Sequence, residues 1–371
     1  MDDRVAGSPG ATGGDTFWAG RRVLLTGHTG FKGSWLALWL TRLGAVTMGI
    51  SLEGSPAPPR LWDDLGLDLE VDDRADLSRP GWEDRIRDFS PEVVLHLAAQ
   101  ALVPVGYADP VLTWTSNVLG TVRLMALLDS LPSLQATLVV TTDKVYDPRQ
   151  PAPHAETAFL GGEDPYSASK AATELVVASW PSLVAPVAVA RAGNVIGGGD
   201  RSPDRLLPDV VRSWASGTPV PLRQPGSVRP WQHVLEPLDG YLRYAEALAT
   251  GRSVPRALNL GPTPGQLVDV ASVVDLAHAL RKDTGLPVPA VAWTSTPCAQ
   301  MPENPLLEID SELARTTLGW SNRLSWQESV AWTVDWHLRA ESGQDPRALV
   351  EDQLDTYLSL SAAASSTGVQ T

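Results

Sequence analysis

Thr26-Gly27-His28-Thr29-Gly30-Phe31-Lys32-Gly33 is the stretch that decides the fold of this chain of 371 residues. A short apolar run at 21–25 precedes it, and apolar residues at three- and four-residue steps follow it from 35 to 43. Glycines in this spacing permit a tight turn, let the backbone approach a pyrophosphate, and let a helix pack closely on a strand. The free N–H groups at the helix N-terminus then attract that anion. The stretch therefore predicts the strand, turn and helix of a dinucleotide site.

Two further strings lie downstream, Thr-Thr-Asp-Lys-Val-Tyr at 141–146 and Tyr-Ser-Ala-Ser-Lys at 166–170. Helix positions i and i+4 share one face, so the ammonium of Lys170 can lie close to the phenol of Tyr166. A nearby cation favours the phenolate, and a tyrosine, whose ordinary pKa is about 10, needs such help to act as a base near neutral pH. The pentad alone is more often a solvated surface pair, but beside the glycine turn it indicates a nicotinamide-dependent site.

Apolar runs predict strands at 45–50, near 71, at 93–99, at 137–140 and at 187–190, with helices at 112–130 and 166–180. This alternation is typical of the α/β class, here a Rossmann-like doubly wound parallel sheet. The string at 141–146 then lies at the carboxyl end of a strand, where open parallel sheets bind their ligands.

Beyond about residue 190 the pattern becomes irregular and richer in proline, with helices predicted near 206–216, 235–249, 268–281 and 325–340. We expect a flexible lead-in over 1–19, with Phe17 and Trp18 packing on the first strand. A NAD-binding domain should cover 20–190, and a smaller mixed α/β lobe over 191–358, interleaved with the first, should hold the substrate. A loose tail is expected over 359–371.

The net charge of −14 argues against nucleic acid or an anionic membrane as a partner, so an anionic ligand would need a locally basic pocket. The single cysteine, Cys298, excludes an internal disulfide and suits a reducing cytoplasm. The six histidines show no metal-ligand spacing, so no metal is expected. We find no apolar run near the roughly 20 residues of a membrane helix.

Six strings together resemble the CDP-glucose 4,6-dehydratases, a branch of the extended short-chain dehydrogenase/reductase family: 26–36, 96–100, 142–146, 166–170, 191–200 and 229–238. The likeness runs from about residue 17 to 336. It implies tightly held NAD and a redox-neutral elimination in which C4 of the sugar of CDP-glucose is oxidised, water leaves across C5 and C6, and hydride returns to C6. The family also suggests a homodimer or homotetramer and a role in deoxysugar biosynthesis.

The resemblance implies roles for three sets of residues. The catalytic set is Thr142, Asp143, Lys144, Tyr166 and Lys170. The cofactor-binding set is Gly27, Thr29, Gly30, Phe31, Lys32, Gly33, Asp76, Leu77, Leu97, Ala98, Ala99, Tyr166 and Lys170. The substrate-binding set is Gln100, Asn194, Arg205, Arg229, Trp231 and His233, in which the arginines can grip a diphosphate. His96 and Asn117 are interpreted as structural.

Lys144 is distinctive, because dehydratases acting on dTDP-glucose carry Asp-Glu where this chain has Asp143-Lys144. An ammonium accepts no proton, so our hypothesis is that burial or Lys170 removes the charge of Lys144 while Asp143 stays protonated. Which of the two residues is acid and which is base stays open in the sequence. Glu53 is the only carboxylate near the second predicted strand for the adenosine ribose, and no arginine is expected beside that strand end, so NAD is expected.

The chain departs from the family pattern at Glu163, at Arg201 and at Pro302-Glu303-Asn304, all interpreted as lying on the substrate side. These departures leave open a different nucleotide sugar as substrate. A nucleotide-sugar 4-epimerase shares the fold and the pentad but needs no acid–base pair, and Asp143-Lys144 argues against it. A non-catalytic NAD-binding scaffold is the third alternative, which the intact Thr142, Tyr166 and Lys170 disfavour.

Overall fold

The computed structural model describes residues 14–54, 60–180, 184–298 and 304–366. The departures from the family pattern at 302 and 303 lie outside these ranges.

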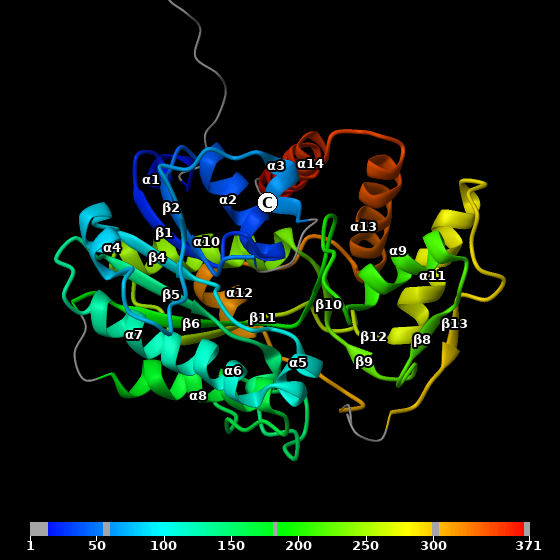
Figure 1. Cartoon of the computed structure of the whole chain (residues 1–371), viewed down its shortest axis with the longest axis horizontal. Helices are drawn as coiled ribbons and strands as arrows, with labels where there is room; N and C mark the ends of the chain where they lie inside the picture. Colours follow the sequence, from blue (N-terminus) through cyan, green and yellow to red (C-terminus); the bar gives the residue numbers. More distant parts are fainter. Residues whose placement is uncertain (1–13, 55–59, 181–183, 299–303, 367–371) are drawn as a thin grey trace, which may run out of the picture.

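A parallel sheet of seven strands forms the centre of the molecule, in the order β11-β6-β5-β4-β1-β2-β3 (Figure 1). Its strands are β1 (Arg22–Thr26), β2 (Val46–Ser51), β3 (Val71–Arg74), β4 (Val93–His96), β5 (Ala136–Val140), β6 (Val187–Ala192) and β11 (Ala257–Leu260). Every neighbouring pair is parallel. The strand order reverses between β1 and β4, which confirms the predicted doubly wound sheet and places its ligand crevice beside the glycine turn.

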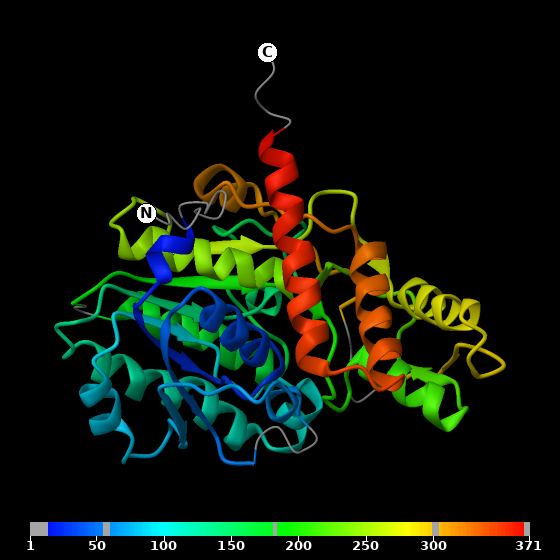
Figure 2. The same ribbon diagram turned by 90° about the horizontal axis from the view of Figure 1, so that it is seen from above.

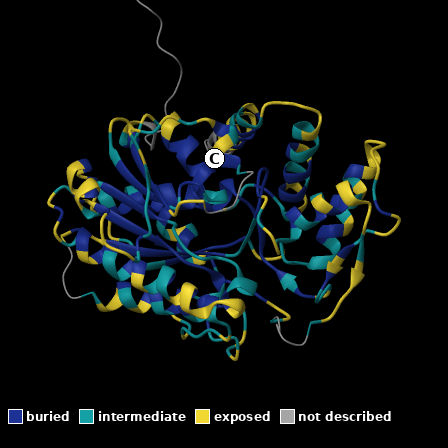
Figure 3. Ribbon diagram, in the orientation of Figure 1, coloured by how far each residue is buried: buried dark blue, intermediate teal, exposed yellow. Residues whose placement is uncertain are grey.

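Side chains alternate along the strands and fill a core on each face of the sheet, so all its strands except the edge strand β3 are largely buried (Figure 3). Val23 and Leu25 of β1 face the core that includes α2 and α10, whereas Leu24 faces the core that includes α4 and α7. The first face carries α2 (Phe31–Arg42), α3 (Leu61–Leu65), α10 (Leu235–Ala249), α12 (Glu312–Leu318) and α14 (Pro346–Ser366). The other face carries α4 (Glu83–Phe89), α7 (Gly120–Leu128) and α8 (Pro165–Ser179).

A smaller lobe is built around a third core, from α9 (Leu206–Ser216), α11 (Val270–Asp283) and α13 (Trp326–Glu341). Three two-stranded sheets complete it, made by β7 (Asn194–Ile196), β8 (Val220–Leu222), β9 (Val228–Arg229), β10 (Trp231–His233), β12 (Val268–Asp269) and β13 (Trp293–Ser295). These helices match the predicted ones within about two residues. Parallel and antiparallel pairs both occur, as expected of a mixed lobe.

The chain returns to the first domain after entering the smaller lobe. Helix α10 packs on β4, β5 and β6, and β11 forms the edge of the central sheet beside β6. Helix α14 contacts α13 and α3, and Figure 2 shows α13 and α14 lying side by side. The predicted interleaving therefore takes the form of one strand, β11, and three helices, α10, α12 and α14, which lie beyond residue 191 and complete the first domain.

Residues 14–18 and 359–366 are helical, although the sequence suggested no regular structure for them. Residues 14–18 form helix α1 (Gly14–Trp18), and Trp18 is buried in the first core, as its packing on the strand required. Helix α14 continues to Ser366, so the loose tail predicted over 359–371 is wrong for 359–366. A helix of 21 residues propagates its own hydrogen bonds once its first turns are packed, which the small residues near its end do not reveal.

Helical residues continue from α5 (Val103–Ala108) into α6 (Pro110–Trp114), a π-helix (Thr115–Leu119) and α7. The stretch 110–128 is long and apolar enough, by length and composition, to cross a membrane. The expectation that no run approaches this length is therefore wrong. The stretch packs against α8, however, and Asn117 within it is buried and hydrogen-bonded.

Candidate active site

The glycine turn joins β1 to α2 with no room for side chains at two of its glycines. Gly27 has a φ of +75°, and a Cβ there would lie 2.8 Å from the backbone nitrogen of Ala98. A Cβ on Gly33 would lie 2.1 Å from the carbonyl oxygen of Gly27. Gly30 is the N-cap of α2 and offers no side-chain cap, so the first N–H groups of the helix stay available. This cradle fits the pyrophosphate of a dinucleotide.

Lys32 extends from the first turn of α2 toward the reacting end of the site. Its Nζ donates to the hydroxyl of Tyr241 at 3.4 Å. Burial, followed by the charges of Arg205 and Lys170, lowers the pKa of Lys32 to about 7. Lys32, a member of the predicted cofactor set, thus has its backbone at the glycine turn and its amine among the predicted catalytic side chains.

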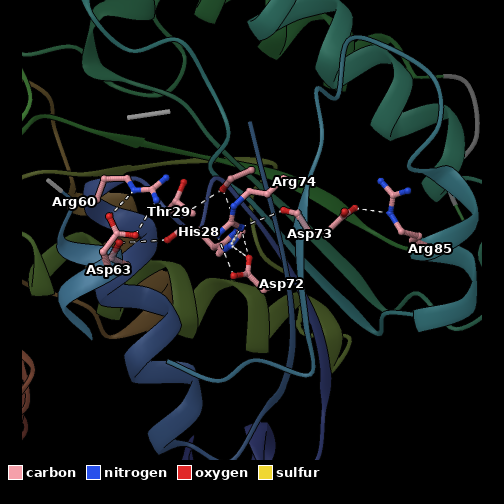
Figure 4. A network of polar contacts seen from close by, with 10 residues as sticks. His28, Thr29, Arg60, Asp63, Asp72, Asp73, Arg74 and Arg85 are labelled. Atoms are coloured by element: carbon pink, nitrogen blue, oxygen red, sulfur yellow. Dashed lines mark hydrogen bonds and ion pairs between the residues drawn. The ribbon is translucent and has the colours of Figure 1, made fainter. Parts of the chain in front are cut away.

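His28, in the middle of the glycine turn, anchors the turn to the neighbouring strands (Figure 4). Its ring is fully buried and hydrogen-bonds Ser51 Oγ through Nδ1 at 2.9 Å and Asp72 Oδ1 through Nε2 at 2.7 Å. The ring fills the space over Gly49, where a Cβ would come within 2.6 Å of it. The sequence did not predict this network, because it joins the turn to β2 and β3, which lie 23 and 44 residues further along the chain.

The adenosine end differs in one respect from expectation. Arg74 pairs with Ser51 in the register of β2 and β3, so an arginine does lie beside that strand end. Its guanidinium forms an ion pair with Asp72, with NH2 donating to Oδ2 at 3.0 Å, and this carboxylate offsets its charge. Glu53 is exposed in the turn after β2. The arrangement is compatible with a ribose that lacks a 2′-phosphate.

Other predicted cofactor residues lie along the switch-point crevice. Ala98 N donates to Thr26 Oγ1 at 3.1 Å, and Ala98 also packs against Gly27, as noted above. Leu97 packs against the first core, and Ala99 is half-buried. Asp76 accepts hydrogen bonds from Ser78, and Leu77 is buried in the second core. Phe31 packs against the first core, and the backbone N–H of Thr29 donates to Ser51 Oγ at 3.2 Å.

The end of β5 brings Thr142, Asp143 and Lys144 to the site. Thr142 caps the short 3₁₀ helix at Asp143–Val145, accepting from Lys144 N at 3.4 Å and donating from Oγ1 to Asp143 Oδ1 at 2.9 Å. Asp143 is buried, and its second oxygen, Oδ2, has no hydrogen-bond partner in the described parts of the chain. An unpaired buried oxygen is costly, so it marks a position where a ligand would bind.

Burial moves the pKa of both members of the pair toward neutrality. It raises the pKa of Asp143 and lowers the pKa of Lys144, in each case as the largest cause. Asp143 acts in the opposite direction on Lys144, whereas Arg205 and Arg229 lower the pKa of Lys144 further. Both directions agree with the hypothesis of a protonated acid beside a neutral amine. The responsible cations are these arginines rather than Lys170.

Tyr166 and Lys170 lie on the buried face of α8, but their relation differs from expectation. Lys170 Nζ donates to the carbonyl of Val140 at 2.7 Å, and burial lowers its pKa to about 8. Burial raises the pKa of Tyr166, against the lowering effects of Arg205 and of a hydrogen bond with Thr142. The prediction that Lys170 depresses the pKa of the phenol is therefore wrong for this structure, because the carbonyl at the end of β5 holds the amine.

His96 and Asn117 have the structural roles that the sequence suggested. His96 hydrogen-bonds Thr26 through Nδ1 at 2.7 Å and Thr121 through Nε2 at 3.0 Å, and burial lowers its pKa to about 3. Asn117 accepts from Gln100 N at 2.7 Å and donates to Ser169 Oγ at 2.9 Å, which joins the π-helix to α8. Both side chains brace the segments that carry the catalytic residues.

A cavity of about 250 Å³ opens between the two lobes beside this cluster. Asp143 and Lys144 line it from the first domain, and Asn194, Arg205, Arg229 and Trp231 line it from the smaller lobe. Arg205 and Arg229 act electrostatically on Lys144, so they lie near the reacting groups. The acidic chain therefore contains the locally basic pocket that an anionic ligand requires.

Two predicted substrate residues do not line this cavity. His233 is fully buried between Trp35 and Trp332, and burial lowers its pKa to about 3, so its predicted contact with the nucleotide is wrong. Trp231, two residues earlier on β10, does line the cavity. The amide of Gln100 is used locally, donating to Thr113 at 2.8 Å and accepting from Leu102 N at 2.6 Å.

The positions at which the chain departs from the family pattern do not all lie in the same part of the structure. Glu163 and Asn304 line the cavity. Arg201 lies outside this lining and forms an ion pair with Asp64 at 2.8 Å, so its interpretation as a substrate-side change is not supported.

The sequence reasoning missed His154, which lines the cavity and is 3% exposed. It also missed a buried ion pair between Arg191 and Glu174 behind the site. Glu174 lies one helical turn after Lys170, so the spacing in the sequence could have indicated that both residues lie on the same face of the helix. His154 lies in an irregular loop where no periodicity points to it.

Comparison with known proteins agrees with this geometry. The sequence model of the NAD dependent epimerase/dehydratase family matches residues 23–261. A CDP-glucose 4,6-dehydratase of Salmonella typhimurium is 37% identical over 92% of this chain and 98% of its own. A dTDP-glucose 4,6-dehydratase of Xanthomonas campestris is 28% identical over 88% of this chain and 92% of its own.

A solved dTDP-glucose 4,6-dehydratase from Streptomyces venezuelae, with NAD bound, has the same fold. It superimposes with a TM-score of 0.74 at 22% identity, covering 88% of this chain and 99% of that chain. The family match covers more than half of the chain, and the Salmonella relative extends it over nearly the whole length. This chain belongs to the NAD-dependent epimerase/dehydratase family.

Proposed function

We propose that this protein is an NAD-dependent 4,6-dehydratase that converts CDP-glucose to CDP-4-keto-6-deoxyglucose. The observation that carries the proposal is the pair of a buried Asp143 and a half-buried Lys144 at the cavity, with desolvation raising the pKa of the acid and lowering that of the amine. The similarity to a CDP-glucose 4,6-dehydratase supports the choice of nucleotide and sugar. NAD would supply a hydride acceptor for C4 and return the same hydride to C6.

The chain's own residues would move the protons. Tyr166 takes the proton of the 4-hydroxyl, while Arg205 and Thr142 favour its phenolate against the effect of burial. The neutral amine of Lys144 removes the proton from C5, which the 4-keto group has made acidic. Asp143, as the protonated acid, gives its proton to the departing 6-hydroxyl, which leaves as water. General acid–base steps of this kind each contribute about 10² to 10⁴ in rate.

The glycine turn and Lys32 would hold the dinucleotide, and Arg205 and Arg229 would hold the diphosphate of the sugar nucleotide. Guanidinium groups suit that task because they pair with phosphate oxygens in bidentate fashion. A 4-epimerase would use Tyr166 and Thr142 but has no step for the pair Asp143 and Lys144.

The test is to incubate the purified protein with CDP-glucose and catalytic NAD and to measure the mass of the product. Loss of one water supports the proposal, and unchanged mass with inverted stereochemistry would identify an epimerase. No change with CDP-glucose, but loss of water from another nucleotide sugar, would correct the substrate alone. No change with any of them would favour the scaffold. In heavy water, the dehydratase product should carry deuterium at C5.

We also propose a homodimer formed through the helices 110–128 and α8. Large apolar side chains on this face are exposed: Val111 (74%), Leu112 (42%), Trp114 (41%), Leu119 (43%) and Leu175 (58%). A second copy would cover them. Leu175→Glu should then yield a monomer in size-exclusion chromatography with light scattering, and an unchanged mass would refute this interface. We also infer a reducing, cytoplasmic setting, because a chain with a single cysteine, Cys298, forms no internal disulfide.

A further inference from the structure

His154 is held in place by backbone hydrogen bonds to a distant part of the chain. Its N–H donates to Glu308 O at 2.9 Å, and its carbonyl accepts from Asp310 N and from Asn259 Nδ2, both at 2.9 Å. A loop with no regular structure of its own is thus fixed at this residue. Side chains that bind ligands precisely are usually supported in this way.

The imidazole is fixed as well. It stacks on the ring of Tyr146, with centroids 4.9 Å apart and planes at 21°. Tyr146 in turn donates to Asn259 Oδ1 at 2.6 Å and accepts from Arg191 NH1 at 2.7 Å. The ring of His154 therefore has one face covered by a side chain that cannot move freely.

One nitrogen of this ring is buried without a hydrogen-bond partner in the parts of the chain that the structure describes. His154 Nδ1 is buried and lacks a hydrogen-bond partner within the described ranges, although the side chain lines the cavity. Asp143 lines the same cavity, interacts electrostatically with His154, and has the unpartnered Oδ2. Leaving a buried polar atom unpaired is unfavourable. Two such atoms on one cavity indicate a ligand that brings hydrogen-bonding groups to both.

A hydroxyl group fits His154 better than a phosphate does. Burial lowers the pKa of His154, so its imidazole is neutral and offers a single donor or acceptor rather than a charge. Arg205 and Arg229, which also line the cavity, carry guanidinium groups that are suited to the diphosphate. Asp143 is the proposed acid for the 6-hydroxyl, so the sugar must approach this wall of the cavity.

Resting on the function proposed above, we propose that His154 binds the sugar itself, through a hydrogen bond between Nδ1 and a hexose hydroxyl. His154 is then a residue that selects the sugar rather than the nucleotide. Glu163 and Asn304, two positions at which the chain departs from the family pattern, line the same cavity.

Binding of CDP-glucose and of CDP, each measured by calorimetry, tests this assignment. All variants are made in a Tyr166→Phe background, so that no turnover disturbs the titration. His154→Phe keeps an aromatic ring on Tyr146 and removes both nitrogens. We expect the Kd for CDP-glucose to rise about 5- to 10-fold, as the loss of one neutral hydrogen bond implies, with the Kd for CDP unchanged. His154→Asn, which restores a polar group near Nδ1, should recover part of the loss.

The assignment would be overturned if the Tyr166→Phe protein and the Tyr166→Phe/His154→Phe protein bound CDP-glucose with equal affinity. An equal loss for CDP and CDP-glucose, or a fall in melting temperature with no rescue by His154→Asn, would also overturn it, since either indicates a packing role. If the Tyr166→Phe protein binds CDP but not CDP-glucose, the proposed substrate is wrong, and this inference fails with it. That result is distinguishable because it appears before His154 is changed.

Discussion

Replacing Glu174 by glutamine should destabilise the protein strongly, although it changes one atom. Glu174 and Arg191 are 4% and 5% exposed, and Arg191 Nε donates to Glu174 Oε1 at 2.9 Å and to Oε2 at 3.0 Å. Thr141 also donates to Oε1, at 2.6 Å. The carboxylate is therefore the counter-charge of a guanidinium that water does not reach.

The magnitude follows from what Glu174→Gln leaves behind. Breaking a buried ion pair costs about 3–5 kcal/mol, because the remaining charge is uncompensated. Glutamine keeps the volume and one acceptor oxygen, and Arg191 NH1 still donates to Tyr146 at 2.7 Å. We therefore expect the lower end, about 3 kcal/mol less free energy of unfolding.

Glu351→Gln is the matched control, with the same chemical change on the protein surface. Glu351 pairs with Arg347 at i and i+4, 3.1 Å apart, with side chains 38% and 44% exposed. Such pairs contribute about 0.3–0.5 kcal/mol. Urea unfolding followed by both fluorescence and circular dichroism measures the two free energies. If Glu174→Gln costs no more than Glu351→Gln, the argument from burial is refuted.

Three further predictions concern the site. Lys144→Met should lower the dehydration rate about 10²- to 10⁴-fold, as expected for loss of a general base, while C4 oxidation still produces reduced nicotinamide absorbance; wild-type exchange of C5–H in this variant would contradict the role of the amine. Lys170 is charged below its pKa of about 8, so the affinity for NAD should weaken as the pH rises through that value. Fluorescence titration with NAD measures this affinity. If a Lys170→Met protein showed the same pH dependence, Lys170 would be excluded as its source. Gly33→Ala should abolish NAD binding and lower the melting temperature, since its Cβ would lie 2.1 Å from a backbone atom. Gly226→Ala is the control and should change neither, because its Cβ would meet no atom within 4 Å. Equal melting temperatures of the two variants would refute the steric argument.

Local sequence patterns were sufficient for the scaffold of this protein. Apolar runs and period-3.6 hydrophobicity depend on neighbours a few residues away, so six of the seven strands of the sheet, β11 excepted, and the helices near 112–130 and 166–180 could be located from the chain alone. The glycine turn between β1 and α2 and the string at 142–144 after β5 followed from the same reasoning. Parallel strands place their carboxyl ends at one edge, which brought these two segments together.

Only the tertiary structure decided which side chains of the site form hydrogen bonds or electrostatic interactions with one another. Lys170 lies on the expected helix face, yet its amine binds the carbonyl of Val140, and the charges beside Lys144 come from Arg205 and Arg229. His233 and Trp231 are two residues apart, but only Trp231 lines the cavity. These outcomes depend on packing between lobes that are far apart in the chain.

The same reason explains His154 and the return of β11 to the sheet. Residues 154 and 308–310 are joined by backbone hydrogen bonds across more than 150 positions, and no spacing rule reaches that distance. The amino-acid sequence by itself determined the elements, the cofactor turn and the catalytic string. The electrostatic neighbours, the buried pairs and the wall of the cavity required the folded chain, because desolvation and charge interactions depend on distances in space.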